Sequence, residues 1–373
     1  MKIAINCAFY QPKGGGISEY IYNLVTNLLN IESGYEYILY VLKDHEEYAR
    51  STLKNARIKQ IPYTSDEPIK RSLFEQRFWN IEEQIESFDV FHSPFFHSPK
   101  FKRAKVVLTV HDLRFCVYPS TYTFKRLVFL KFAVERSVKA ADHIISISEF
   151  TKNELMKYYN LPQNKITTIH EAINTSDFTE KCIVSYDLDK RIVNYLDNKK
   201  FLFSLGHIEP RKNYIQLVKA FKRIRLKHPD VYLVVAGKKA QGYKEFLKAI
   251  SGEENIIYLD FVSRSTLLWL YKNATAFVFP SIYEGFGFPP LEAAALGTPS
   301  AVSISSCIPE ICGDGALYFD PGNIDDIEKA CERILIDSSV QSAIAIKARE
   351  NLLRFSWKNN ACQTLLVYNT LIH

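Results

Sequence analysis

The sequence predicts an α/β protein with two domains, each built around a parallel sheet that helices cover on both faces. Short apolar runs of strand length recur along the chain, and helix-like segments separate most of them. These runs are nearly continuously apolar, which is typical of parallel strands buried on both sides. A length of 373 residues corresponds to about two domains. Residues 180–199 show no strong periodicity, so we place the boundary there, with residues 1–180 as the first domain and 181–355 as the second.

The elements follow in order along the chain. The expected strands of the first domain are Ile3–Cys7, Tyr37–Leu42, Ile58–Ile61, Asp89–His92, Val106–Val110, His143–Ile147 and Ile166–Ile169. Those of the second domain are Phe201–Leu205, Val231–Ala236, Ile256–Leu259, Ala276–Pro280 and Ser300–Ile304. Helices are expected at Ser18–Leu29, from Asn213 to His228, at Ser265–Lys272, at Pro290–Leu296 and from Lys358 to about Leu371.

The composition limits the classes of protein to which this chain can belong. Hydrophobic residues make up 47% and charged residues 24%, which are ordinary values for a soluble globular protein. No run of eighteen apolar residues occurs and the amino terminus enters a strand directly, so we expect neither a membrane span nor a signal peptide. Seven cysteines, an odd number without a C-x2-C pair, indicate free thiols in a reducing, cytoplasmic compartment.

The net charge of +6 is concentrated in the amino-terminal half. This excess of positive charge is smaller than is typical of a surface that binds nucleic acid, and we find no nucleic-acid-binding motif. It is compatible with peripheral association with an anionic membrane face. The segment Phe124–Ala140, FKRLVFLKFAVERSVKA, mixes cations with large apolar residues. Two interpretations stay open: a helix that lies in a membrane interface, and a core helix with a solvated basic edge.

The stretch from Ala276 to Pro299 carries the clearest chemical signal. Ala276–Pro280 has strand length, and Pro290–Leu296 has the composition of a helix that a proline opens and a glycine closes. Glu284 in the loop and Glu292 early in the helix form an E-x7-E pair. Open α/β sheets bind ligands at the carboxyl ends of their strands, and two carboxylates placed there suit a ligand rich in hydroxyl groups.

The run SIYEGFGFPPLEA closely resembles the E-x7-E signature of retaining glycosyltransferases of family 4. These enzymes have the GT-B fold, two facing Rossmann-like domains with a cleft between them. The resemblance implies that Glu284 contacts the donor sugar and Glu292 the ribose of the nucleotide, with further donor contacts from Gly285, Phe286 and Gly287. An isolated E-x7-E pair is more often a loop carboxylate and a helix acid favoured by the helix dipole. The complete run outweighs that interpretation.

A second motif, GHIEPRKN, follows the expected strand Phe201–Leu205. Arg211 and Lys212 place two cations beside the amino end of a helix, where a departing diphosphate would gather charge. Alone, such a pair is usually a solvated surface pair. Within the resemblance it matches the family's phosphate-binding pair, and the form EPRKN is associated with mannosyl- and related hexosyltransferases. GDP-mannose is therefore the favoured donor.

Two features of the first domain add to the predicted site. The loop after the first strand contains Gly14-Gly15-Gly16, whose exposed amides at a helix start suit a phosphate, although the spacing fails as a dinucleotide fingerprint. The resemblance implies that Gly15 and Gly16 contact the donor. VLTVHDL ends an expected strand at His111, which the resemblance places close to the donor sugar. Asp112 is expected to cap the next turn.

We therefore expect a hexosyltransferase that moves a sugar, with retention, from a nucleotide sugar to a hydroxyl of a glycan or lipid-linked saccharide. We expect no metal or other cofactor, and no nucleic-acid partner. The resemblance implies an amino-terminal acceptor domain, a carboxyl-terminal donor domain and a final helix, residues 356–373, that crosses back to the first domain. Arg211, Lys212, Glu284 and His111 are the candidate catalytic residues.

Alternatives remain at three points. UDP- and dTDP-sugars stay open as donors, because family members have glycine where this chain has Asp260 or Phe261, next to the base pocket. An epimerase or a phosphorylase would share the architecture, although no pyridoxal-binding lysine is identifiable. A non-catalytic nucleotide-sugar-binding protein is the third alternative.

Ala172 replaces another family glycine, which puts the local turn between the domains in doubt.

Overall fold

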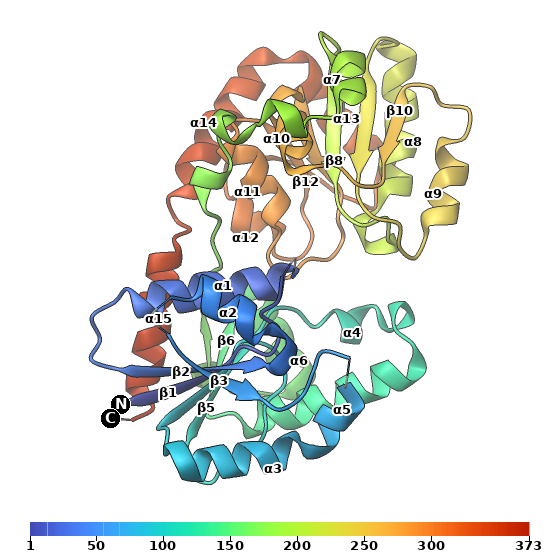
Figure 1. The fold of residues 1–373 in the computed structure, drawn as a ribbon. Coiled ribbons are helices and arrows are strands. Elements are labelled where there is room, and N and C mark those ends of the chain that lie inside the picture. Colours follow the sequence, from blue (N-terminus) through green and yellow to red (C-terminus); the bar gives the residue numbers. More distant parts are fainter. Residues whose placement is uncertain (13, 55, 67, 373) are drawn as a thin grey trace. The chain divides into compact units, whose positions relative to one another are not determined.

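The computed structural model divides the chain into two compact units (Figure 1). It describes residues 1–12, 14–54, 56–66 and 68–372, with the backbone alone for residues 68–73. Unit 1 comprises Met1–Ala172 together with the segment that starts at Ser356, and unit 2 is Ile173–Phe355. The division after Ala172 lies slightly before the predicted boundary at residue 180.

Unit 1 contains a parallel sheet with the strand order β3-β2-β1-β4-β5-β6-β7. Its strands are β1 (Lys2–Asn6), β2 (Glu36–Leu42), β3 (Arg57–Ile61), β4 (Val90–Ser93), β5 (Lys105–Val110), β6 (His143–Ser146) and β7 (Ile166–Thr168). All seven predicted strands are confirmed, with ends that differ by one residue. Its helices are α1 (Gly16–Leu29), α2 (Glu46–Thr52), α3 (Pro68–Glu86), α4 (Arg114–Val117), α5 (Phe124–Ala140), α6 (Glu149–Tyr159) and α15 (Trp357–Thr370).

Unit 2 contains a second parallel sheet with the order β10-β9-β8-β11-β12-β13. Its strands are β8 (Phe201–Leu205), β9 (Tyr232–Ala236), β10 (Ile256–Leu259), β11 (Ala276–Phe279), β12 (Ser300–Ser303) and β13 (Leu317–Phe319). Its helices are α7 (Lys190–Leu196), α8 (Tyr214–Lys227), α9 (Tyr243–Ile250), α10 (Arg264–Asn273), α11 (Phe288–Ala295), α12 (Ile308–Cys312), α13 (Ile324–Ile336) and α14 (Ser338–Leu352). The sequence did not predict β13, whose three residues are too few to form a recognisable apolar run.

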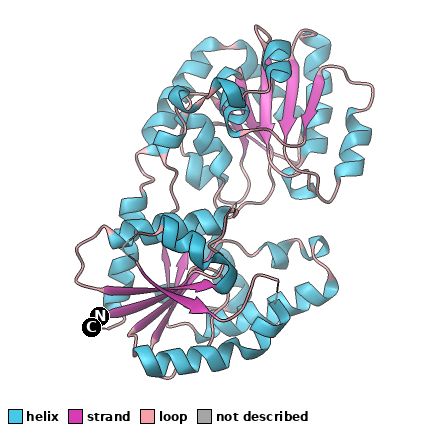
Figure 2. Cartoon of the chain, viewed as in Figure 1, coloured by secondary structure: helices cyan, strands magenta, loops and turns pink. Residues whose placement is uncertain are grey.

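Both faces of the unit 2 sheet are buried, as the nearly continuous apolar strands predict. Successive residues of one strand point to opposite faces, so Leu233 and Val235 join one core cluster while Val234 joins the other. Figure 2 shows helices on both sides of the strands of this sheet. The sheet is therefore doubly covered, and its strand ends are the places left for a ligand.

The carboxyl-terminal helix α15 belongs to unit 1. It packs beside α1, and its Tyr368 hydroxyl lies 2.6 Å from Nδ1 of His92 on β4. The other ring nitrogen of His92 lies 2.8 Å from the Thr109 hydroxyl on β5. Burial lowers the pKa of His92 to about 3, so the ring is neutral and serves as a structural link between α15 and the sheet. His92 is therefore a fully buried residue of the strand core.

Helix α5 combines the two interpretations that the sequence left open. Leu130, Val134 and Val138 are buried in the core of unit 1, whereas Phe124 and Phe132 are exposed. Among the residues that the structure describes, no helix has both the length and the apolarity needed to cross a bilayer. Helix α5 is thus a core helix whose outer face also carries large apolar side chains.

Candidate functional site

The two predicted motifs of unit 2 meet at one edge of its sheet. Strands β8 and β11 are neighbours at the point where the strand order reverses, which is where open α/β sheets bind ligands. The loop after β8 forms a short turn at Pro210–Lys212, and the loop after β11 starts at Pro280. The Ile282 amide donates to the Arg211 carbonyl across 2.8 Å, so the backbones of the two loops are joined directly.

Three side chains predicted from these motifs form one charged cluster. The Lys212 ammonium lies 2.5 Å from Oε1 of Glu284, and the Arg211 guanidinium lies 2.7 Å from Oε2 of the same carboxylate. Arg211 also contacts Glu209 at 2.6 Å. All four side chains are at most 14% exposed. Two cations therefore face two carboxylates in a nearly buried, charge-balanced site.

The charge states follow from this pairing. Burial alone would raise the pKa of Glu284, but the charges of Lys212 and Arg211 outweigh burial and hold that pKa below its ordinary value. Burial lowers the pKa of Lys212, although Glu284 opposes the change. Ser281 also donates to Glu284 at 2.6 Å. Glu284 is thus an ionised hydrogen-bond acceptor and not a proton donor at neutral pH.

Two residues that follow β12 hold the loop that carries Glu284 in place. The Glu284 amide donates to the Ser306 hydroxyl, and the Cys307 thiol approaches the carbonyls of Glu284 and Phe286. The Phe286 ring is buried against other aromatic rings, so a ligand can reach this residue only through its backbone. Gly287 has φ of +95°, a conformation that favours glycine, and it starts α11 without a side-chain cap.

Glu292 lies on α11, the helix expected to carry the second glutamate of the E-x7-E pair, but it is not part of the charged cluster. Its Oε2 accepts a hydrogen bond of 2.8 Å from the hydroxyl of Tyr271 on α10. Burial raises the pKa of Glu292, and the Tyr271 hydrogen bond opposes that rise only in part. The two glutamates of the E-x7-E pair therefore occupy electrostatically different environments, one paired with cations and one with a phenol.

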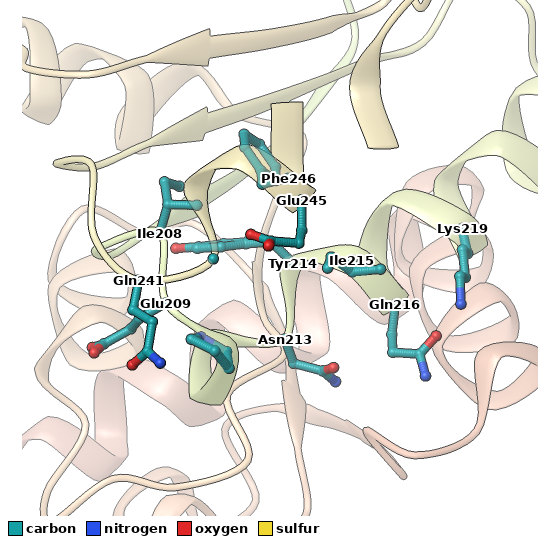
Figure 3. Close-up of a pocket in the computed structure, with 12 residues that line it drawn as sticks. Ile208, Glu209, Asn213, Tyr214, Ile215, Gln216, Lys219, Gln241, Glu245 and Phe246 are labelled. Atoms are coloured by element: carbon teal, nitrogen blue, oxygen red, sulfur yellow. The ribbon is translucent and has the colours of Figure 1, made fainter. Parts of the chain in front are cut away.

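Residues of the same β8 loop, Ile208, Glu209 and Pro210, also line a pocket of about 380 Å³ (Figure 3). Tyr214 and Phe246 line it from α8 and α9, together with polar side chains such as Gln216 and Gln241. Glu209 lines this pocket and also contacts Arg211 of the charged cluster. The pocket and the cluster thus share Glu209.

In unit 1, the glycine loop has one crowded position and two open ones. A Cβ atom at Gly14 would lie 2.3 Å from Cβ of Ser18, so glycine is required there by close packing. A Cβ atom at Gly15 or Gly16 would meet nothing within 4 Å. Gly15 precedes α1 and makes no side-chain cap. The predicted ligand contacts, Gly15 and Gly16, therefore face open space at a helix start.

His111 directly follows β5, as predicted, and both its ring nitrogens are engaged. Nδ1 lies 2.9 Å from Oε1 of Glu171, and Nε2 lies 2.9 Å from the Pro94 carbonyl oxygen. Sequence reasoning missed Glu171, which is almost completely buried just before the end of unit 1's first segment. Asp112 accepts from the Arg114 amide, which confirms its capping role. Ser148 caps α6, because its hydroxyl accepts from the Thr151 amide.

The described residues contain no group of three or more histidine, cysteine or acidic side chains that could hold a metal ion. All seven cysteines are free thiols. Arg211 and Lys212 are the side chains placed to neutralise an anionic ligand in unit 2. Cations of this kind bind a diphosphate more strongly than a neutral ligand, although Glu209 and Glu284 balance their charge in this structure.

Comparisons with known proteins match both halves of the chain. The family model described as Glycosyltransferase Family 4 matches residues 14–177, and the model described as Glycosyl transferases group 1 matches residues 186–351. O-antigen chain mannosyltransferase B of Escherichia coli is 28% identical over 76% of this chain and 74% of its own length. O-antigen chain mannosyltransferase RfbU of Salmonella typhimurium is 30% identical over 61% of this chain and 60% of its own length.

Solved structures agree on the fold. The crystal structure of Anabaena HepE in complex with UDP aligns with 99% of this chain and 100% of that chain at a TM-score of 0.74 and 15% identity. The sucrose-phosphate synthase from Thermosynechococcus elongatus aligns with 100% of this chain and 99% of that chain at a TM-score of 0.73 and 17% identity. The predicted class, α/β with two Rossmann-like parallel sheets of the GT-B type, is confirmed.

Proposed function

This chain belongs to the family 4 glycosyltransferases, and from that premise we propose that it transfers a hexose from a nucleotide sugar to a hydroxyl of a glycan or lipid-linked saccharide, with retention. The observation that carries the proposal is the buried cluster of Arg211, Lys212 and Glu284 at the reversal point of the unit 2 sheet. Mannose from GDP-mannose is the first choice of donor. It is supported by the two relatives that are named as mannosyltransferases. A UDP-sugar is the alternative, because HepE binds UDP.

The transfer breaks the bond between the anomeric carbon and the diphosphate oxygen, and it forms a bond from that carbon to the acceptor oxygen on the same face. The acceptor's proton passes to the departing phosphate oxygen. Arg211 and Lys212 stabilise the negative charge that develops on the departing diphosphate. This electrostatic stabilisation is strongest in a site shielded from water. We assign His111 the role of a positioning group and not of a base, because Glu171 and the Pro94 carbonyl already engage both of its ring nitrogens.

The cluster suggests how donor binding and sugar orientation are linked. Without donor, Glu284 accepts hydrogen bonds from both cations. A diphosphate competes for Arg211 and Lys212, and this competition frees lone pairs of Glu284 for the sugar hydroxyls. Glu284 therefore neutralises the cations in the empty site and orients the sugar in the loaded one.

The test is to incubate the purified protein with GDP-mannose, UDP-glucose and dTDP-glucose, each with and without an octyl glycoside acceptor, and to analyse the products by mass spectrometry and NMR. Transfer that requires the acceptor and yields an α-linked product supports the proposal. Arg211→Ala and Lys212→Ala should each lower kcat by about 10²- to 10³-fold. Arg225→Ala, at a partly exposed ion pair on α8, serves as the control.

The rival functions give different results. An epimerase converts the donor when no acceptor is present, and a non-catalytic binding protein shows nucleotide-induced stabilisation without any turnover. Retention of the donor's anomeric configuration also has to be observed directly. An inverted product would leave the glycosyltransferase assignment intact and reject the retaining mechanism.

We place the reaction at an anionic membrane surface, with α5 as the contact. The side chains of Phe124, Val128 and Phe132 are 80%, 51% and 68% exposed on this helix. Lys125, Arg126 and Lys131 lie exposed among them. Large apolar side chains interleaved with cations are the features of helices that lie in anionic membrane interfaces.

Sedimentation with vesicles tests this contact. Binding to phosphatidylglycerol vesicles should weaken as salt rises from 50 to 500 mM, because screening reduces the attraction between cations and lipid. The double substitution Phe124→Ser and Phe132→Ser should reduce binding at every salt concentration. Leu226→Ser changes an exposed leucine of unit 2 and serves as the control. Binding that responds neither to salt nor to the double substitution would reject α5 as the contact.

A further inference from the structure

Unit 1 has its own pocket at the reversal point of its sheet. In the order β3-β2-β1-β4-β5-β6-β7, the chain builds outward from β1 on one side and from β4 on the other. Such a point leaves a crevice at the carboxyl ends of the two central strands. Ala8 and Phe9 follow β1, and Phe95, Phe96 and His97 follow β4. All five residues line one pocket of about 140 Å³.

The pocket has aromatic walls and a small polar group. Phe9 packs edge-on against Phe95 with ring centroids 4.5 Å apart, and Trp79 of α3 lies in the same wall. His97 faces Glu75 of α3, with Nδ1 3.3 Å from Oε1.

This chemistry fits a sugar ring and does not fit a diphosphate. Aromatic side chains cover the C–H surface of a sugar, while a carboxylate and an imidazole exchange hydrogen bonds with its hydroxyl groups. A diphosphate needs cations, and the described residues that line the pocket include neither lysine nor arginine. Glu75 would repel an anion at this position.

One wall of the pocket continues onto the outer surface of α5. Phe129 lines the pocket and is itself 50% exposed. It adjoins Val128 in sequence, and Phe132 lies one turn further along the same helix. An apolar path thus leads from the sugar-sized pocket to the exposed phenylalanines of α5. The ligand suited to both parts has a saccharide end and a hydrocarbon chain.

We propose that this pocket, lined by Glu75, His97 and Phe129, binds the saccharide end of a lipid-linked acceptor. The proposal rests on the glycosyltransferase function proposed above and names the class of its acceptor. Glu75 and His97 bind sugar hydroxyls, and Phe129 contacts the junction between sugar and lipid. These residues select and hold the acceptor, and they take no part in bond breaking.

Isothermal titration with octyl mannoside, below its micelle concentration and without donor, tests binding independently of turnover. The wild type should bind it at least tenfold more tightly than methyl mannoside. Glu75→Gln should weaken binding of both compounds about tenfold. Phe129→Ala should weaken octyl mannoside about tenfold and leave methyl mannoside little changed. Phe74→Ala is the matched control, because Phe74 precedes Glu75, is 51% exposed and does not line the pocket.

The outcomes separate this proposal from the proposed function. The thermal shift caused by GDP or UDP should be the same in the wild type and in all three variants, which shows that unit 2 is intact. If nucleotides bind and sugar transfer occurs but Glu75→Gln and Phe129→Ala bind octyl mannoside like the wild type, the acceptor pocket is wrong. No binding of octyl mannoside by the wild type also rejects it. Octyl mannoside binding without transfer from any donor rejects the proposed function instead.

Discussion

His111 and Glu171 form a buried pair in unit 1, with Nδ1 of the imidazole 2.9 Å from a carboxylate oxygen. The opposite ring nitrogen faces the Pro94 carbonyl, which can only accept a hydrogen bond. Both ring nitrogens therefore need a proton, and His111 is an imidazolium. Burial alone would lower its pKa, but the hydrogen bond and charge of Glu171 outweigh burial, so the pKa of His111 is raised.

This pair predicts a pH dependence of stability. A raised folded-state pKa stabilises the protein fully below the unfolded pKa near 6.5, and that contribution is lost as pH rises through the folded pKa. The free energy of unfolding, measured with urea, should therefore fall on the alkaline side of pH 6.5 by about 1.4 kcal/mol for each unit by which the pKa is raised. Three other groups face the His111 ring. The charge of Asp112 also raises the pKa of His111, the Tyr20 ring packs edge-on against the imidazole, and the His92 imidazole is neutral.

Glu171→Gln isolates the source of this dependence. The amide cannot supply the negative charge, so the fall in stability above pH 6.5 should disappear and the His111 ring signals in NMR should titrate at lower pH. Glu135→Gln, at an exposed ion pair on α5, should leave both curves unchanged. An unaltered His111 titration in Glu171→Gln would show that the carboxylate does not hold the proton.

Glu284→Gln should separate nucleotide binding from turnover. The substitution removes the carboxylate that competes with the diphosphate for Arg211 and Lys212, so the affinity for GDP or UDP should rise. The sugar loses its orienting acceptor, and kcat should fall on the order of 10²-fold, the cost of misplacing a reacting group. Calorimetric titration and initial rates measure the two effects. Weaker nucleotide binding in Glu284→Gln would contradict competition within the cluster.

The sequence predicted the strands well for a physical reason. A parallel strand that is buried on both faces needs an apolar side chain at nearly every position. Phe201–Leu205 is therefore visible as an apolar run broken only by Ser204, and Ile256–Leu259 as an unbroken run, both with the bounds that the structure gives. The strand Leu317–Phe319 escaped prediction because it is too short for such a run and is only partly buried. Strand ends were less certain, since a single polar residue can belong to strand or loop.

The site was predicted in part. Arg211, Lys212 and Glu284 come together because their loops follow neighbouring strands, and the motifs marked both loops. The pairing of His111 with Glu171 depends on the order β5-β6-β7, which the sequence does not state. The buried Phe286 ring and the crowding at Gly14 depend on packing in three dimensions, which composition and spacing do not reveal.

Two substitutions in the glycine loop of unit 1 distinguish a glycine required for packing from one that contacts the ligand. Gly14→Ala forces a Cβ atom against Ser18 and should cost about 1–3 kcal/mol of stability, as overpacking does. Gly15 has φ of −86° and open space around it, so Gly15→Ala should change stability by no more than about 0.5 kcal/mol. If Gly15 contacts the donor, Gly15→Ala should still raise the donor KM. A normal donor KM in this stable variant would remove Gly15 from the site.

Glu292 offers the clearest separation of nucleoside from phosphate recognition. A nucleotide at 100 times its Kd should add about 2.7 kcal/mol of stability to the wild type, measured as a thermal shift with GDP, UDP, dTDP and ADP in turn. Because Glu292 lies outside the charged cluster and is the predicted ribose contact, Glu292→Gln should reduce the shift caused by the preferred nucleoside diphosphate. Inorganic pyrophosphate has no ribose, so its shift should be equal in both proteins. Tyr271→Phe removes only the hydrogen bond that positions Glu292, and its shift should lie between those of the wild type and Glu292→Gln. Equal loss of the pyrophosphate and nucleotide shifts would mean that the substitution disturbs the diphosphate site, and Glu292 would then have no separate role at the ribose.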